Sequence, residues 1–125
     1  MERFRFLEWS VYKDAKSVGS EILEIVKTLP NEYRFEMGNQ VIRSSMSIAL
    51  NIAEGSGKGS DKDFNHFLNI SLGSLNETVA VIDIFRDNKL ITEVKFQEIK
   101  AKLEGIANQL GGFKKKLTKV KSYKS

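Results

Sequence analysis

Residues 93–120 read EVKFQEIKAKLEGIANQLGGFKKKLTKV, and the spacing of the apolar side chains in this stretch decides the fold. From Ile99 to Val120 the apolar residues follow one another at alternating steps of four and three. Such spacing places them on one face of an α-helix, as in helices that pack lengthwise against one another. We therefore predict a helix over 93–119. The stripe consists of Phe96, Ile99, Leu103, Ile106, Leu110, Phe113, Leu117 and Val120.

Three earlier segments repeat this three-four spacing and predict helices over 10–29, 34–54 and 61–88. Ser10, Ser60 and Thr92 stand where N-caps are expected, and Trp9 is placed to pack against the first turns of its helix. Pro30 ends the first helix. No alternating strand pattern competes, and short connections make successive helices antiparallel neighbours. The prediction is an all-α, up-down-up-down four-helix bundle occupying residues 1–125 as a single domain.

The second predicted helix has small residues in its middle and glycines at its end. Ser44, Ser45, Ser47 and Ala49 would let a neighbouring helix approach closely. The loop after it reads GSGKGS over 55–60, and its glycines predict the left-handed backbone that often ends a helix. In the fourth helix the pair Gly111-Gly112 costs on the order of 2 kcal/mol in helix propensity, so the basic end is expected to be a separate, looser turn.

Composition excludes several kinds of site. The 125 residues include no Cys and one His, so disulfides and Cys-ligated metals are ruled out, and histidine-dependent catalysis must use His66 or not exist. No apolar run of about 18 residues and no signal peptide is present, which predicts a cytoplasmic protein without membrane association. The expectation is a protein that is not an enzyme and that uses no cofactor and no metal.

The net charge of +4 is concentrated at one end of the chain. Residues 1–112 hold 14 Lys and Arg against 16 Asp and Glu, whereas the basic tail, residues 113–125, holds six Lys and no acid. Such a segment could neutralise phosphates of nucleic acid or anionic lipid. A solvated C-terminus without a partner explains it equally well.

Three constellations could carry chemistry. Asp63 and His66 have the i, i+3 spacing of bundle metal sites, with Glu54 and Glu77 on neighbouring helices. Such sites normally use two His, so a solvent-facing His66 is favoured.

The second candidate is the glycine loop with Lys58 and Lys62, which could receive one phosphate at a helix start. A plain turn between helices is favoured over this interpretation.

The third constellation is a polar stripe on the second predicted helix, formed by Arg43, Ser47, Asn51 and Glu54. If the stripe is buried, its charges should pair with Glu77, Asp83 or Asp14 of other helices or of another subunit, because unpaired buried charge is costly. If it is exposed, it is an ordinary solvated face. The sequence leaves both interpretations open.

The stretch QVIRSSMSIALNIAEG over 40–55, followed by FNHFL over 64–68 and GSLNE over 73–77, resembles the proteins encoded in 23S rRNA intervening sequences, also called the S23 ribosomal protein family. The resemblance extends from Leu7 through the fourth helix. It implies a ring-like homopentamer without established enzymatic activity. A related branch, the accessory variability protein of diversity-generating retroelements, binds a reverse transcriptase and nucleic acid. The resemblance also suggests that Arg43, Asn51, Glu54 and Glu77 hold helices or subunits in register.

Two functions follow from different classes. The first is an oligomeric scaffold or accessory protein that binds RNA or a nucleoprotein, and its candidate contacts are Lys58, Lys62, Lys114, Lys115, Lys116, Lys119 and Lys121. The alternative is a protein-interaction adaptor with no nucleic-acid role, in which the bundle surface receives a partner protein. A small enzyme using the carboxylates of Glu54 and Glu77 is a distant third.

Overall fold

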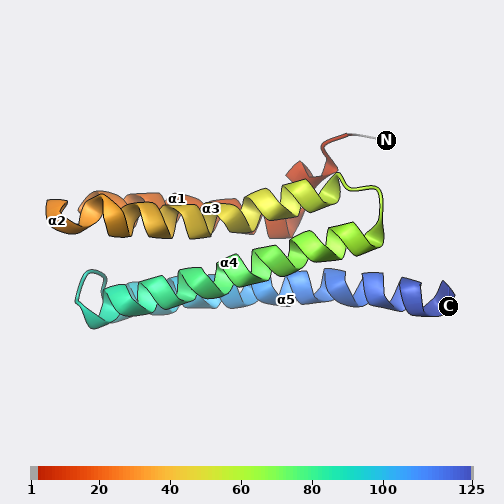
Figure 1. Ribbon diagram of the computed structural model, residues 1–125. Helices are drawn as coiled ribbons and strands as arrows, with labels where there is room; N and C mark the ends of the chain where they lie inside the picture. Colours follow the sequence, from red (N-terminus) through yellow and green to blue (C-terminus); the bar gives the residue numbers. More distant parts are fainter. Residues whose placement is uncertain (1–2, 125) are drawn as a thin grey trace.

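The computed structural model describes residues 3–124 and, for side chains, residues 3–117. Four long helices carry the fold: α1 (Ser10–Thr28), α3 (Glu36–Ser56), α4 (Asp61–Asp87) and α5 (Glu93–Lys124). A short 3-10 helix, η1 (Arg5–Glu8), precedes α1, and the single turn α2 (Asn31–Arg34) follows Pro30. Figure 1 shows α1 and α3 lying above α4 and α5, with each long helix antiparallel to the next along the chain. The predicted four-helix bundle is confirmed.

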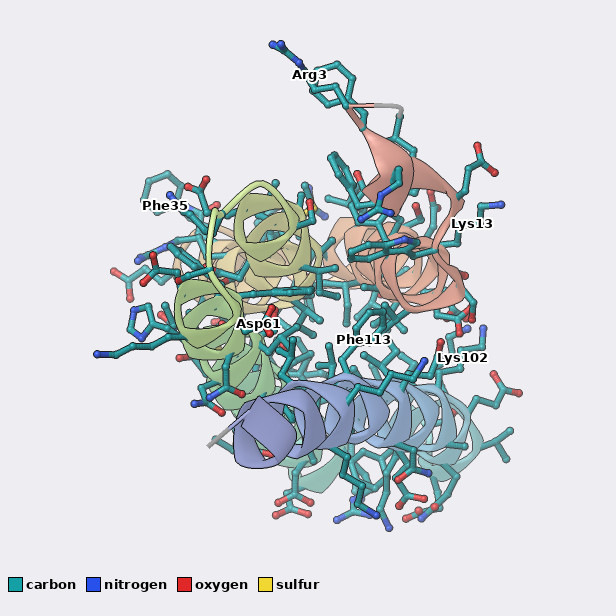
Figure 2. All side chains as sticks on the ribbon, turned by 90° about the vertical axis from the view of Figure 1, so that its right-hand side faces the viewer. Arg3, Lys13, Phe35, Asp61, Lys102 and Phe113 are labelled. Carbon is teal, nitrogen blue, oxygen red and sulfur yellow. The ribbon has the colours of Figure 1, made fainter. Side chains whose placement is uncertain are left out.

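The four long helices surround one core. Helix α1 contacts α3 and α5, and α4 also contacts α3 and α5. Side chains on the inner stripes are fully buried, as expected when every amphipathic helix turns its apolar face to one core. On α5 the stripe from Phe96 to Leu110 is buried. In the end-on view of Figure 2, Phe113 points inward from α5 toward α1. The apolar stripe predicted for the last helix therefore faces the core as far as Leu117, and the side chain of its last member, Val120, lies outside the described residues.

Small polar residues lie between α3 and α4; of these, Ser44 belongs to the small residues predicted to allow close approach, whereas Ser71 and Thr78 of α4 were not predicted to do so. Ser44, Ser71 and Thr78 are buried between the two helices. The Ser71 hydroxyl donates to the backbone carbonyl of Ile48 at 2.8 Å, and the hydroxyls of Thr78 and Ser44 lie 2.9 Å apart. A side chain can reach the backbone of a neighbouring helix in this way only when the two helices lie close together. Every buried side-chain oxygen and nitrogen in the described part of the chain has a partner.

Several details of the helix ends differ from the predictions. Ser10 is the first residue of α1 and does not cap it; its hydroxyl donates instead to Gln109 of α5 at 2.7 Å. Trp9 packs on Phe64 and Phe113, from α4 and α5, and so joins three elements where a local contact within α1 was expected. The other two caps are confirmed, because Ser60 accepts from the Asp63 amide and Thr92 from the Lys95 amide, both at 3.1 Å.

The predictions for the glycines of the loop 55–60 and for the pair Gly111-Gly112 were both wrong. Over residues 3–124 no glycine has a positive φ; Gly57 ends α3 at φ −91° and ψ 0°. The left-handed position falls instead on Lys89, with φ 60°, where the Leu90 amide donates to the Phe85 carbonyl at 2.8 Å and closes the end of α4. The Gly111-Gly112 pair does not interrupt α5, which is one helix to Lys124. The predicted looser turn is therefore a continuous helical extension.

Candidate functional site

A polar groove lies between α3 and α4 and contains most of the polar stripe. Its volume is about 590 Å³. Three residues of the stripe line it, and Glu77 of α4 lies opposite them. The lining residues are Gln40, Ile42, Arg43, Ser44, Met46, Ser47, Leu50, Asn51, Ser74 and Glu77. The structure therefore places Arg43, Ser47 and Asn51 of the predicted stripe in one groove with Glu77, and it leaves Glu54, the fourth member of the stripe, outside the groove.

Hydrogen bonds fix the polar side chains of this groove. The hydroxyls of Ser47 and Ser74 lie 2.7 Å apart and connect α3 to α4. The Asn51 amide donates to both the carbonyl and the hydroxyl of Ser47 at 2.8 Å. At one end of the groove the Gln40 amide donates to the Glu77 carboxylate, also at 2.8 Å. Of these bonds, Ser47–Ser74 and Gln40–Glu77 join α3 to α4, whereas those of Asn51 stay within α3. None of them involves Arg43, which lies on the groove wall.

The structure resolves whether the charges of the stripe are buried. Within one chain Arg43 and Glu54 are exposed, so neither needs a buried partner from another helix of the same chain. Among the described residues Arg43 has no ion pair, and Glu54 meets Lys58 one turn later at 3.9 Å. Asp83 and Asp14 have other partners: Asp83 pairs with Arg86, and Asp14 accepts from Gln109 at 2.8 Å. Within one chain the stripe is therefore exposed, and pairing of its charges with another subunit stays a prediction.

A second cluster forms where the start of α4 meets the later turns of α5. The Lys114 ammonium donates to Asn65 Oδ1 at 3.1 Å and also to Asn69. Lys58, in the loop before α4, places its ammonium 5.1 Å from the centre of the Phe67 ring. Lys62, Lys115 and Lys116 are exposed. Five of the predicted nucleic-acid contacts therefore share one end of the bundle, while the side chains of Lys119 and Lys121 lie outside the described residues.

Two features of the bundle, one at this end and one between α1 and α3, were not predicted from the sequence. Aromatic rings of Trp9, Phe64 and Phe113 pack together at this end, with centroids 5.1 to 6.0 Å apart. An apolar groove of about 250 Å³ lies between α1 and α3, with Leu23, Met46 and Leu50 partly exposed along it. In the sequence, these three apolar residues fall outside the core stripes of α1 and α3. Apolar residues outside the core stripe were the feature from which this groove could have been predicted.

Neither of the other predicted constellations forms a compact site. Asp63 and His66 are both exposed, and His66 packs its ring against Phe67. Within the described part of the chain, no group of three or more acidic or histidine side chains is arranged to hold a metal ion. The glycine loop joins α3 to α4, and the Ser60 cap occupies the Asp63 amide at the start of α4.

None of the described helices is long and apolar enough to cross a membrane.

Four antiparallel helices with a polar groove on one face and lysines gathered at one end define a small all-α helical-bundle protein. Residues 8–112 match the family described as 23S rRNA-intervening sequence protein, and the chain belongs to this family. A crystal structure of a protein of unknown function from the S23 ribosomal protein family of Bacteroides thetaiotaomicron has the same fold. It is 30% identical, with a TM-score of 0.78, and the similarity covers 84% of this chain and 98% of that one. No curated protein matches this chain.

Proposed function

We propose that this protein is a non-enzymatic, oligomeric helical bundle that binds RNA or a ribonucleoprotein as an accessory or scaffold component. The observation that carries the proposal is the contact of Lys114 with Asn65 and Asn69, because it sets the lysines of α5 beside those that surround the start of α4. Residues 64–76, between the acids at the start of α4 and Glu77, contain no Asp or Glu. The second and third turns of α4 therefore carry no acid, while Lys62 stands between Asp61 and Asp63 and Lys58 pairs with Glu54.

Oligomerisation would multiply the effect of this end. A ring of five copies, as the family resemblance implies, would present the basic tail five times. Several weak phosphate contacts then add through effective concentration, so useful affinity does not require a tight single site. The polar groove between α3 and α4 carries Arg43, Asn51 and Glu77, three of the four residues that the resemblance assigns to holding helices or subunits in register. The family's name agrees with an RNA partner, and the cytoplasm is the compartment where such a partner is found.

The test is binding of a fluorescently labelled structured RNA, measured at several salt concentrations. The double variant Lys115→Gln/Lys116→Gln should weaken binding and reduce the slope of log affinity against log salt by about one unit for each phosphate that is no longer neutralised. The control Lys27→Gln/Lys100→Gln removes the same charge from exposed or half-exposed positions remote from this end and should leave the slope unchanged. Equal effects of the two variants, or no RNA binding by the wild type, would contradict the proposal.

The apolar groove favours a second candidate, a protein-interaction adaptor. Leu23, Met46 and Leu50 are 42%, 42% and 59% exposed and line one continuous strip across α1 and α3. Exposed apolar strips of this kind are typical of surfaces that receive another helix. Purification from the native host separates the candidates. Nucleic acid bound to the protein supports the first, whereas one dominant protein partner without nucleic acid supports the second.

A further inference from the structure

One exposed stripe of α4 combines a histidine ring with amide and ammonium groups. Lys62, His66 and Asn69 stand at positions i, i+4 and i+7, which places them on one face of the helix. All three are exposed. The acids Asp61 and Asp63 are confined to the first turn, and the next acid along α4 is Glu77. The carboxylate nearest to this stripe is therefore that of Asp63, one turn before His66, and beyond His66 the stripe meets no acid of α4 before Glu77.

The His66 imidazole is an exposed ring with a fixed support. It packs edge to face with Phe67, with ring centroids 5.3 Å apart and an angle of 75° between the planes. A single neighbouring ring can cover only one face of the imidazole, so the other face stays uncovered by Phe67. Phe67 in turn packs closely against α3, where a Cβ atom placed on Gly55 would lie 2.9 Å from the Phe67 Cβ. The helix beneath His66 is thus held in place before any ligand arrives.

Cations lie on two sides of this ring. Lys62 is one turn before His66 on the same stripe. On the other side, Lys114 of α5 is held by Asn65 and Asn69, and Asn69 is the next member of the stripe after His66. The Lys58 ammonium is placed over Phe67. An uncovered aromatic face between cations matches what an unpaired nucleotide needs, because its base stacks on a ring while its flanking phosphates meet positive charge.

We infer that Lys62, His66 and Lys114 form a subsite for an unpaired RNA nucleotide, in which the base stacks on His66 and the flanking phosphates contact the two lysines. The inference rests on the proposed RNA-binding function and specifies the kind of RNA. Bases inside a duplex are already stacked on their neighbours and cannot reach the imidazole, so the subsite selects single strands, loops or bulges over continuous duplex.

The experiment compares two probes on the full-length protein: a fluorescein-labelled oligoadenylate, and the same strand annealed to oligouridylate. His66→Ala should weaken binding of the single strand about tenfold and leave duplex binding unchanged, because only the single strand stacks. His66→Phe keeps a ring at this position and should retain most of the single-strand affinity. Asn76→Ala changes another exposed residue of α4 and should have no effect on either probe.

The outcomes separate this inference from the function on which it rests. If the wild type binds neither probe nor a structured RNA, the proposed RNA-binding function is wrong, and the subsite is wrong with it. If the wild type binds RNA but His66→Ala weakens both probes equally or neither, the function stands and the stacking subsite is refuted. Loss of single-strand binding in His66→Phe as large as in His66→Ala also refutes stacking. Circular dichroism of each variant checks that the bundle is folded.

Discussion

At the scale of single residues, Gly55 shows how one missing side chain sets the distance between two helices. It is the last residue of the stretch 40–55 that carries the family resemblance, and it is buried against Phe64 and Phe67 of α4. A Cβ atom at this position would lie 2.9 Å from Phe64 Cδ1 and 2.9 Å from Phe67 Cβ. The second of these atoms is attached directly to the α4 backbone, so a rotamer change cannot relieve the contact.

We therefore expect Gly55→Ala to lower the free energy of unfolding by about 1–3 kcal/mol, the usual cost of overfilling a packed interface. The matched control is Gly73→Ala, since Gly73 is also inside a helix but a Cβ there meets nothing within 4 Å. That variant should be stabilised by up to about 1 kcal/mol through helix propensity alone. Urea denaturation measures both changes, and equal effects of the two substitutions would argue against close packing at Gly55.

The small hydroxyl residues between α3 and α4 also allow the two helices to lie close together. Ser44 and Ser45 could be identified from the sequence as residues that allow a neighbouring helix to approach closely, because the size of a side chain follows from the residue type. Their partners could not, because the bond from Ser71 to the Ile48 carbonyl depends on the rotation of α4 against α3. Arg43 is a similar case: its position on the stripe follows from spacing, while its exposure depends on where α4 lies.

At the scale of the helices, α5 continues through Gly111-Gly112 although two adjacent glycines disfavour a helix. Phe113, directly after the pair, packs on Trp9 and Phe64, and Lys114 is anchored on α4. These tertiary contacts outweigh the local propensity, which is why the predicted break was wrong. The glycines themselves have no steric role within the bundle, since a Cβ on either one meets nothing within 4 Å.

The double variant Gly111→Ala/Gly112→Ala should consequently gain stability by up to about 2 kcal/mol, from two residues at about 1 kcal/mol each. Its helical circular dichroism signal should also rise and persist to higher temperature. Gly59→Ala is the control, because Gly59 likewise has open space but lies in the loop before α4. A loss of stability in the double variant would show that the glycines serve a packing role between copies of the chain.

At the scale of the whole molecule, Glu21 joins the first helix to the last. Its carboxylate accepts from Lys102 at 2.7 Å and from Lys95 at 3.4 Å, both on α5, and Figure 2 shows Lys102 on the side of α5 that faces α1. Burial disfavours the charged form, but the hydrogen bonds and charges of Lys102 and Lys95 outweigh it and hold the pKa of Glu21 below its usual value of 4.5.

This lowered pKa predicts how stability depends on pH. The stabilisation is fully present above about pH 4.5, where the carboxylate is ionised in both states, and it is lost as the pH falls through the lower pKa of the folded state. Glu21→Gln should therefore lose less stability than the wild type when the pH is lowered from neutral into this acidic range. Glu24→Gln, which changes an exposed carboxylate paired only with Lys27 of its own helix, should follow the wild type. Denaturant midpoints across pH measure the difference.

The sequence by itself determined four amphipathic helices, their order and their antiparallel arrangement, because these depend on spacing, capping residues and short connections between neighbours in the chain. It also placed Arg43, Ser47 and Asn51 on one stripe of a helix, but it grouped Glu54 with them, and Glu54 lies outside the groove. Only the tertiary structure decided that Arg43 is exposed, that Lys114 lies on Asn65 and Asn69, and that Trp9 packs between α4 and α5. Each of these features depends on residues far apart in the chain, and so on the relative rotation of packed helices, which a periodic pattern leaves open.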